Sequence, residues 1–207
     1  MAPRTPPLVV VGLVGGIASG KSTVARLFVE QGAALLDADA MAHACLAEPA
    51  VRAAIAARFG ESVVDPVGHV DRKALGAIVF DDPKARTDLE SIIHPRVATR
   101  LREELARLAA EGRPRVVVLD VPLLFESGLD ALCDTVVYVD APIAVRRERA
   151  MRDRGWGPDE LDRREKNQRS TEHKKARAGL MIRNLGSIEP LRARTRELLQ
   201  KILTEHA

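Results

Sequence analysis

The chain has 207 residues, 46% of them hydrophobic, and a formal net charge of +3 at pH 7. This length suits one α/β domain with insertions, and the longest apolar runs, such as Leu8 to Val14, fall far short of the roughly 18 residues of a membrane span. Residues Met1 to Pro7 carry one arginine and precede a strand-like run without a small-residue cleavage site. We therefore expect a disordered leader rather than a signal peptide, and a cytoplasmic protein. Cys45 and Cys133 have no metal-ligand spacing and are expected to be reduced thiols.

The first predicted elements are a strand, a glycine-rich loop and a helix. The loop sequence, Gly15-Gly16-Ile17-Ala18-Ser19-Gly20-Lys21-Ser22, fits the phosphate-binding pattern G-x-x-x-x-G-K-[ST] and lies between the apolar run Leu8 to Val14 and the amphipathic stretch Thr23 to Gln31. Glycines let backbone N–H groups converge on phosphate oxygens, and the positive end of the helix dipole points at the same anion. Lys21 would reach the β- and γ-phosphates and Ser22 a Mg²⁺ ion. The alternative is an ordinary glycine-rich turn before a helix.

Further short, near-continuous apolar runs follow, as expected for parallel strands that are buried on both faces. They are Ala33 to Leu36, Val116 to Leu119, Thr135 to Val139 and Leu180 to Ile182. Helices between them predict an α/β fold with a doubly wound, five-stranded parallel sheet of the phosphate-loop kinase type, a helical insertion and a helical lid.

Two of the helices are predicted from leucine spacing. The insertion between the second and third strands carries an apolar stripe that ends before Gly112 and Pro114, formed by Val97, Leu101, Leu105 and Leu108. The last helix carries a stripe of its own, formed by Leu191, Leu198, Leu199, Ile202 and Leu203.

Carboxylates follow several of the predicted strands, at the sheet edge where ligands bind in open α/β folds. Asp39 comes just after the second strand, where a kinase carboxylate can accept the proton of the acceptor hydroxyl or hold Mg²⁺; alternatively it caps a helix over Ala40 to Leu46. Asp37 is the weaker candidate. Asp120 and Asp140 both end Val-rich runs, and either could help to position Mg²⁺ or serve as a cap.

A basic stretch extends from Arg146 to Arg183, and Trp156 is its one aromatic residue. Such a stretch could bind nucleic acid, a membrane or a polyphosphate. A single aromatic gives little support for base stacking. In a chain with a phosphate loop, a mobile basic lid over ATP is the preferred interpretation; a solvated helical face and a nucleic-acid surface are the alternatives.

Several segments of the chain form a distinctive combination. The first is the phosphate loop with its flanks, Val11 to Val24, followed by Leu36-Asp37-Ala38-Asp39 and His43. The others are Asp71 to Gly76 with Phe80, Leu89 to Pro95, Asp120 to Glu126, Arg149 to Gln168, Lys174, Arg177 and Ile182 to Ser187. This combination resembles the dephospho-coenzyme A kinase family over essentially residues 8 to 203.

The resemblance implies ATP-dependent phosphorylation of the ribose 3′-hydroxyl of dephospho-CoA, the last step of coenzyme A biosynthesis. It implies ATP and Mg²⁺ as cofactors and a monomer without a nucleic-acid or membrane partner. The implied catalytic residues are Lys21, Asp39 as the base, and Arg149. The implied nucleotide-binding residues are Gly16, Ile17, Ala18, Ser19, Gly20, Lys21, Ser22, Thr23, Arg177 and Asn184, with Ser22 on the metal. The implied acceptor-binding residues are Asp39, His43, Arg72, His94, Pro122 and Leu123.

The resemblance also implies a division of the chain. Residues 8–39 and 114–207 would form the nucleotide-binding core, with a lid at about 146–178, and residues 40–113 a helical insertion that binds the acceptor. For His94 there is an alternative, because Pro95 restricts its predecessor to extended backbone, where an imidazole can bond a nearby carbonyl.

A few positions depart from the family's usual pattern. Ala18 stands where the family often has glycine, and Gly179 and Arg183 where it often has aspartate. Which of Arg152 and Arg154 meets phosphate is open.

Other enzyme classes share parts of these patterns. A kinase for a different small acceptor would have the same core and lid. A GTPase is a further alternative, because Asp65-Pro66-Val67-Gly68 matches the GTPase pattern D-x-x-G. It is disfavoured because the guanine-binding sequence Asn-Lys-x-Asp does not occur in the chain. A nucleic-acid-binding ATPase would use the basic stretch as a polyanion contact.

Overall fold

The computed structural model describes residues 7–65, 67–166 and 168–207, so the expected leader, apart from Pro7, lies outside the described residues. The described chain groups into two compact units, residues 7–37 with 105–207 and residues 38–104. We call them the sheet unit and the helical unit and describe each by itself. Among the described residues, no helix has both the length and the apolar character that crossing a bilayer requires.

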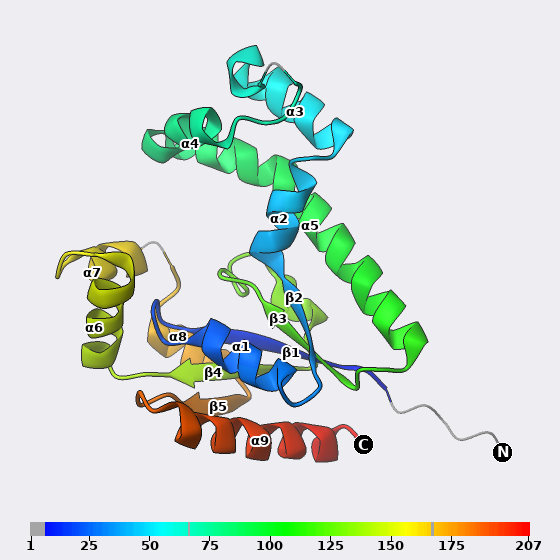
Figure 1. The fold of residues 1–207 in the computed structure, drawn as a ribbon, viewed down its shortest axis with the longest axis vertical. Helices are drawn as coiled ribbons and strands as arrows, with labels where there is room; N and C mark the ends of the chain where they lie inside the picture. The colour runs from blue at the N-terminus through cyan, green and yellow to red at the C-terminus, as the bar shows by residue number, and fades with distance from the viewer. Residues whose placement is uncertain (1–6, 66, 167) are drawn as a thin grey trace. The chain divides into compact units, whose positions relative to one another are not determined.

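The sheet unit is built on five parallel strands in the order β2-β3-β1-β4-β5 (Figure 1). Their bounds are β1 Val9–Gly15, β2 Ala34–Asp37, β3 Val116–Asp120, β4 Thr135–Asp140 and β5 Leu180–Arg183. The predicted α/β fold with a five-stranded parallel sheet is confirmed. Because β1 lies in the centre, the loop that follows it opens at the carboxyl edge of the sheet, between its two halves.

Helices α1 (Lys21–Val29) and α9 (Ile188–Glu205) cover one face of the sheet. Alternate β1 residues, Val9, Val11 and Leu13, point into this core with Phe28 of α1 and Ile202 of α9. Burial of each large aliphatic side chain contributes about 1.5–3 kcal/mol. Packing in this core therefore fixes the position of α1 and, with it, the end of the loop that precedes this helix.

The loop after β3, with the 3₁₀ turn η2 (Leu129–Leu132), packs on the other face of the sheet. Gly12 has no room for a side chain there, since a Cβ would lie 2.6 Å from Leu124 Cδ2 and 2.8 Å from Cys133 Sγ. Cys133 and the buried Cys45 are both free thiols, as expected from the sequence.

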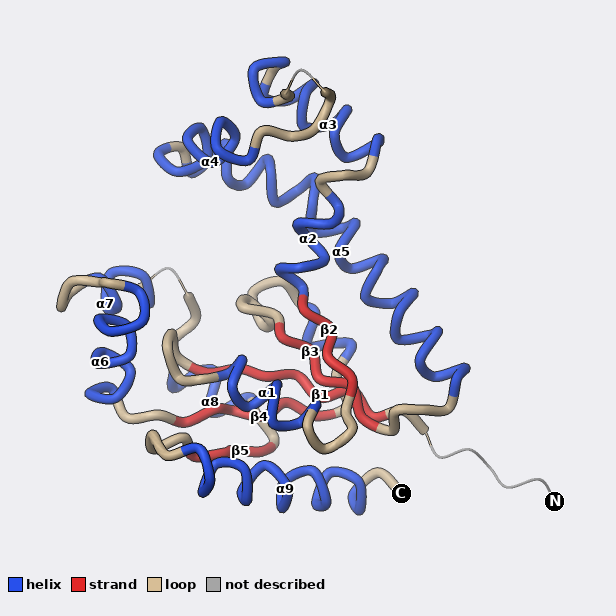
Figure 2. Tube along the Cα trace, viewed as in Figure 1, coloured by secondary structure: helices blue, strands red, loops and turns tan. Residues whose placement is uncertain are grey.

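Three helices follow β4 in the region predicted as a lid: α6 (Ile143–Arg154), α7 (Glu160–Glu165) and α8 (Thr171–Arg177) (Figure 2). The indole of Trp156 lies between two guanidinium groups, with Arg154 at 4.8 Å and Arg164 at 4.5 Å from the ring centroid. Such cation–π contacts fasten the end of α6 to α7. Asn167, between α7 and α8, lies outside the described residues.

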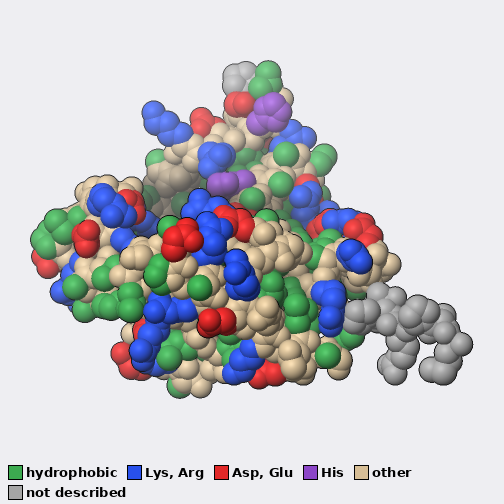
Figure 3. Space-filling model, turned by 60° about the horizontal axis from the view of Figure 1, so that its bottom comes forward, with side chains coloured by type: hydrophobic (Ala, Val, Ile, Leu, Met, Phe, Trp, Pro, Cys, Tyr) green, Lys and Arg blue, Asp and Glu red, His purple; other side chains and the backbone are tan. Residues whose placement is uncertain are grey.

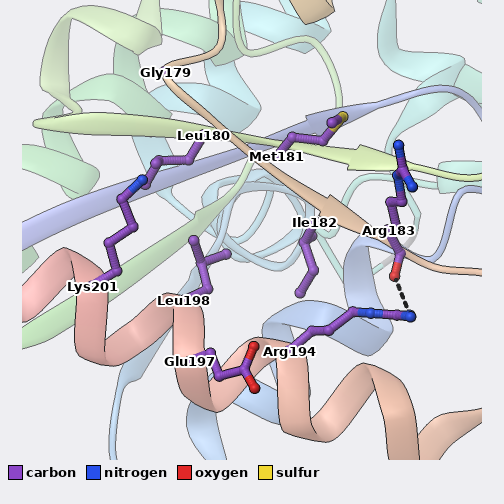
Figure 4. A pocket seen from close by; sticks show the side chains of 9 residues that line it. All are labelled: Gly179, Leu180, Met181, Ile182, Arg183, Arg194, Glu197, Leu198 and Lys201. Atoms are coloured by element: carbon purple, nitrogen blue, oxygen red, sulfur yellow. Dashed lines mark hydrogen bonds between the residues drawn. The ribbon is translucent and has the colours of Figure 1, made fainter.

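Strand β5 is an edge strand and forms a groove of about 510 Å³ with α9 (Figure 4). Arg194 reaches from α9 to the backbone and donates to the carbonyl oxygen of Arg183 at 3.2 Å. A charged side chain that bonds an edge carbonyl disfavours pairing with another strand.

The helical unit contains α2 (Ala38–Cys45), α3 (Pro49–Phe59), the 3₁₀ turn η1 (Glu61–Val63), α4 (Arg72–Asp81) and the first part of α5 (Pro83–Glu111). Its buried side chains include Ile55, Val63 and Leu101. Glu48, at the start of α3, bonds Arg96 and also Arg100 at 2.7 Å. These ion pairs join α3 to α5.

Two alternatives for this unit are wrong. Helix α5 runs through Pro95, so His94 is helical rather than extended. Burial of Ala85 and Leu101, on either side of the proline, favours the continuous helix and opposes a local cost of about 3 kcal/mol. Helix α2 begins at Ala38, so Asp39 lies within the first turn and not at the N-cap.

Candidate functional site

The predicted phosphate loop connects β1 to α1 and contains two residues in the left-handed region. Ala18 has a φ of 58° and Gly20 a φ of 91°, both left-handed. Glycine adopts this region without strain, which explains the frequent glycine at the position of Ala18. Gly20 is the N-cap of α1 and provides no side-chain bond. The first N–H groups of α1 therefore have no partner within the helix and point at the loop.

Glycine is also required in the loop because side chains from other elements approach its backbone. A Cβ on Gly16 would overlap the Arg146 guanidinium, and one on Gly20 would overlap the Asn184 amide nitrogen. The backbone at these two glycines thus lies directly against polar side chains.

The ammonium group of Lys21 lies back over the loop, with Nζ 3.5 Å from the carbonyl oxygens of Gly15 and Gly16. Desolvation lowers the pKa of Lys21 to about 8, although the nearby Asp120 carboxylate acts in the opposite direction. A desolvated cation with only weak carbonyl contacts is ready to bind an anion.

Ser22 and Asp120 bring a hydroxyl and a carboxylate together. Ser22 Oγ donates to Asp120 Oδ2 at 3.2 Å. At the end of β4, the backbone carbonyl of Asp140 accepts from the backbone N–H of Asn184 at 2.7 Å. Oxygen ligands of this kind suit Mg²⁺, which usually binds one or two carboxylates together with substrate phosphates. Within the described ranges no cluster of three His, Cys, Asp or Glu residues could hold a metal alone, so this pair would need phosphate oxygens to complete the set.

Arg149 and Asn184 clamp the loop from outside. Arg149 donates to the carbonyl oxygen of Ser19 at 3.2 Å and to Asn184 Oδ1 at 3.0 Å. The buried Asn184 also donates to the Ser19 carbonyl at 2.8 Å. The resemblance named both residues, and the structure brings them together on the loop.

A cavity of about 250 Å³ opens beside this clamp. Its lining includes Ala18, Thr23, Arg149, Arg152, Asn184 and Gly186. Arg152 bonds its neighbour Asp153 at 2.7 Å. Arg154, which also lines the cavity, acts on Lys21 and helps to lower its pKa, although burial is the main cause. Arg152 acts in the same way on Arg149 and helps to lower its pKa, although burial is again the main cause, so both arginines add positive charge beside the loop.

Arg146 and Glu165 were not predicted as site residues. Arg146 is 7% exposed and donates to Glu165 Oε1 at 2.6 Å and to the carbonyl oxygen of Ile17 at 3.3 Å. Glu165 Oε1 also accepts from the Ile17 amide at 2.8 Å. No local sequence pattern signals a contact between residues that are so far apart in the chain.

Other arginines of the basic stretch bond acidic neighbours. Arg147 pairs with Asp162 at 2.7 Å and Arg164 with Glu160 at 2.7 Å. On the face drawn in Figure 3, Lys and Arg side chains are interspersed with Asp and Glu. Arg177 bonds Asp130 at 2.7 Å and lies 4.5 Å from the Phe125 ring centroid, which ties it to the loop after β3. Pro122 and Leu123 belong to the same loop.

In the helical unit, two of the residues implied for acceptor binding lie in contact. Arg72 Nη2 is 3.1 Å from His43 Nε2. Asp39 and His94 are exposed. Asp71 caps α4 by accepting from the amides of Lys73 and Ala74, which fixes the start of the helix that carries Arg72.

Comparisons with known proteins agree on one family. A family model described as dephospho-CoA kinase matches residues 9–190. A dephospho-CoA kinase from Anaeromyxobacter dehalogenans is 50% identical over 192 residues, which cover 92% of this chain and 90% of that protein. One from Symbiobacterium thermophilum is 45% identical over 89% of this chain and 77% of its own length.

Solved structures give the same result. The dephospho-CoA kinase from Campylobacter jejuni superimposes with a TM-score of 0.73 and 26% identity, and the match covers 96% of this chain and 98% of that one. A shikimate kinase from Acinetobacter baumannii, at 19% identity and a TM-score of 0.55 over 96% of this chain and 94% of its own, shares the fold alone.

Proposed function

Because this chain belongs to the dephospho-CoA kinase family, which uses ATP to phosphorylate dephospho-CoA in the last step of coenzyme A biosynthesis, we propose how its own residues carry out that transfer. The observation that carries the proposal is the loop Gly15 to Ser22, where uncapped helix N–H groups, a desolvated Lys21 and the Ser22–Asp120 pair converge. This is a site for a metal-bound polyphosphate.

ATP is bound through its phosphates. Residues Gly16 to Thr23 bind these phosphates, the N–H groups at the start of α1 donate to phosphate oxygens, and Lys21 pairs with the β- and γ-phosphates. Arg149 is held beside the loop by Asn184 and adds a further positive charge at the edge of the site. These cations stabilise the charge that develops on the transferring phosphoryl group.

Ser22 and Asp120 would hold Mg²⁺, since their oxygens are adjacent and Mg²⁺ favours such ligands with phosphate and water. The ion neutralises negative charge on the phosphates when it is bound. Asp140 is not proposed as a ligand.

Asp39 is proposed as the base. It lies in the first turn of α2, two residues after β2 ends. Its carboxylate accepts the proton of the ribose 3′-hydroxyl while that oxygen forms a bond to the γ-phosphorus and the bond to the ADP oxygen breaks. His43, Arg72 and His94, with Pro122 and Leu123, are proposed to bind the rest of the acceptor, and residues 40–113 to form most of its binding region.

The nucleoside of ATP is proposed to occupy the cavity of about 250 Å³ beside Asn184. Residues 146–178 are proposed as the lid, with Arg177 among its ATP contacts. We further propose a monomer in the cytoplasm, where ATP is available and where the free thiols Cys45 and Cys133 stay reduced.

The test is a coupled assay of ATP consumption with dephospho-CoA, followed by phosphorus NMR of the product. We expect ADP to form only with the acceptor present, and the new phosphate to lie on the ribose 3′-oxygen. Lys21→Ala is the matched negative control. A phosphate on another oxygen, or turnover of shikimate without turnover of dephospho-CoA, would contradict the proposal and leave a kinase for another acceptor.

A further inference from the structure

Glu165 places a carboxylate where the phosphate loop would hold an anion. Its Oε1 accepts from the Ile17 amide at 2.8 Å and from Arg146 Nη1 at 2.6 Å. A backbone N–H and a guanidinium that converge on one anionic oxygen form the surroundings in which loops of this kind hold phosphate. The carboxylate comes from the last residue of α7 and not from the loop itself.

The space around this contact is narrow. A Cβ on Gly16 would lie 2.9 Å from Glu165 Oε1 and would overlap the Arg146 guanidinium. The loop backbone, the cation and the carboxylate therefore lie against one another, and the Ile17 N–H is already bonded to the carboxylate. A phosphate oxygen and Glu165 would compete for it.

Arg146 would need another anion if Glu165 moved away. Its side chain is buried, and Glu165 is the acidic group that bonds it. A buried cation that loses its counter-ion is strongly destabilised unless another anion replaces it. If Glu165 leaves the loop, a phosphate group in its place would bond both Arg146 and the Ile17 amide.

We propose that Glu165 occupies an anion position of the phosphate loop while no nucleotide is bound, and that a phosphate of ATP displaces it and takes over Arg146 as a ligand. The inference rests on the proposed function, since it needs ATP in the loop. It adds Arg146 to the residues that bind ATP phosphates. It also makes α7 a helix whose contact with the loop depends on nucleotide.

Calorimetric titration with MgATP, without acceptor, tests the displacement. Glu165→Gln keeps the size of the side chain and removes its charge, so the variant should bind MgATP about tenfold more tightly, the effect expected when a charged competitor is removed. Glu111→Gln is the matched control because it makes the same change on α5, outside the proposed lid, where Glu111 pairs with Arg107 at 2.5 Å. It should bind like the natural protein. Equal or weaker binding by Glu165→Gln would overturn the proposal.

The amide resonance of Ile17 gives a second readout that does not depend on affinity. Without nucleotide, the natural protein and Glu165→Gln should differ at this resonance; saturated with MgATP, they should coincide. A difference that persists under saturation would mean that Glu165 stays on the amide, against the proposal. Arg146→Gln, added to Glu165→Gln, should abolish the gain in affinity, and retention of the gain would remove Arg146 from the phosphate ligands. Absence of MgATP binding by every protein would contradict the proposed function itself, whereas binding without these differences contradicts only this inference.

Discussion

At the scale of single residues, Lys21 shows a conflict between stability and function. Burial holds the pKa of its ammonium group at about 8, far below the usual value of 10.5. The folded protein therefore holds a charge that water would solvate better, and bound phosphate would relieve this cost. The fold does not gain from this buried charge, which agrees with the phosphate-binding role proposed for Lys21.

Replacement of this lysine should therefore stabilise the nucleotide-free protein. Below pH 8 Lys21 is charged in both states and its desolvation penalty applies in full; between pH 8 and 10.5 the unfolded chain binds more protons, so the penalty fades as the pH rises. We expect Lys21→Met to raise the free energy of unfolding by roughly 1–3 kcal/mol at pH 7, with a smaller gain at pH 10. Urea unfolding at the two pH values measures this. A gain that grows with pH would contradict the desolvation argument.

Asp39 leads to a prediction about rate rather than stability. Asp39→Asn preserves size but removes the basicity that the proposed proton transfer needs. We expect kcat to fall by about 10²- to 10⁴-fold while the Kd of ATP stays nearly unchanged. Steady-state kinetics and nucleotide titration separate the two quantities. A normal kcat in a variant with a much lower melting temperature would instead make Asp39 a structural residue of α2.

At the scale of elements, the phosphate loop depends on close approach as well as on conformation. Gly20 and Gly32 both have a φ of 91°, but a Cβ on Gly20 would overlap the buried Asn184, while a Cβ on Gly32 would meet nothing within 4 Å. A comparison of the two positions therefore separates the cost of left-handed backbone strain from the cost of steric overlap.

Alanine at each position should reveal the difference. Gly32→Ala should cost about 1 kcal/mol from backbone strain alone. Gly20→Ala should cost a further 1–3 kcal/mol, roughly the penalty of overpacking, and should also weaken ATP binding because Asn184 is pushed from the Ser19 carbonyl. Thermal unfolding and nucleotide titration of both variants provide the comparison. Equal losses of stability would show that Asn184 moves aside without cost.

At the scale of the whole molecule, the proposed function assigns different tasks to the two units. The sheet unit carries the phosphate loop, and the helical unit carries most of the residues proposed for the acceptor, including the contact between His43 and Arg72. Binding energy from parts of the acceptor far from the reacting hydroxyl is what orients that hydroxyl.

A truncated acceptor should therefore react poorly. Adenosine keeps the ribose 3′-hydroxyl but lacks the diphosphate and the pantetheine, so we expect its kcat/KM to be lower than that of dephospho-CoA by at least about 10³-fold. Arg72→Ala should reduce kcat/KM for dephospho-CoA while leaving the small value for adenosine nearly unchanged. The two acceptors can be compared in one coupled assay. Equal kcat/KM values would argue against a binding role for the helical unit.

The sequence by itself determined the features that depend on neighbours along the chain. The glycines of the loop Gly15 to Ser22 permit its turns, and Val-rich runs such as Val116 to Leu119 are typical of strands that are buried on both faces. The bounds of the strands and of the loop were therefore predicted within a residue or two. The apolar stripe through Leu101 and Leu108 predicted α5 in the same way.

Only the tertiary structure decided the contacts between distant segments. It placed Asp120 rather than Asp140 on Ser22 and brought Glu165 to the Ile17 amide, 148 positions away along the chain. Spacing along a chain records which residues share a face of one element, because that periodicity is local. It holds no record of which side chains meet when separate elements pack, since those contacts follow from strand order and helix placement in the folded sheet unit.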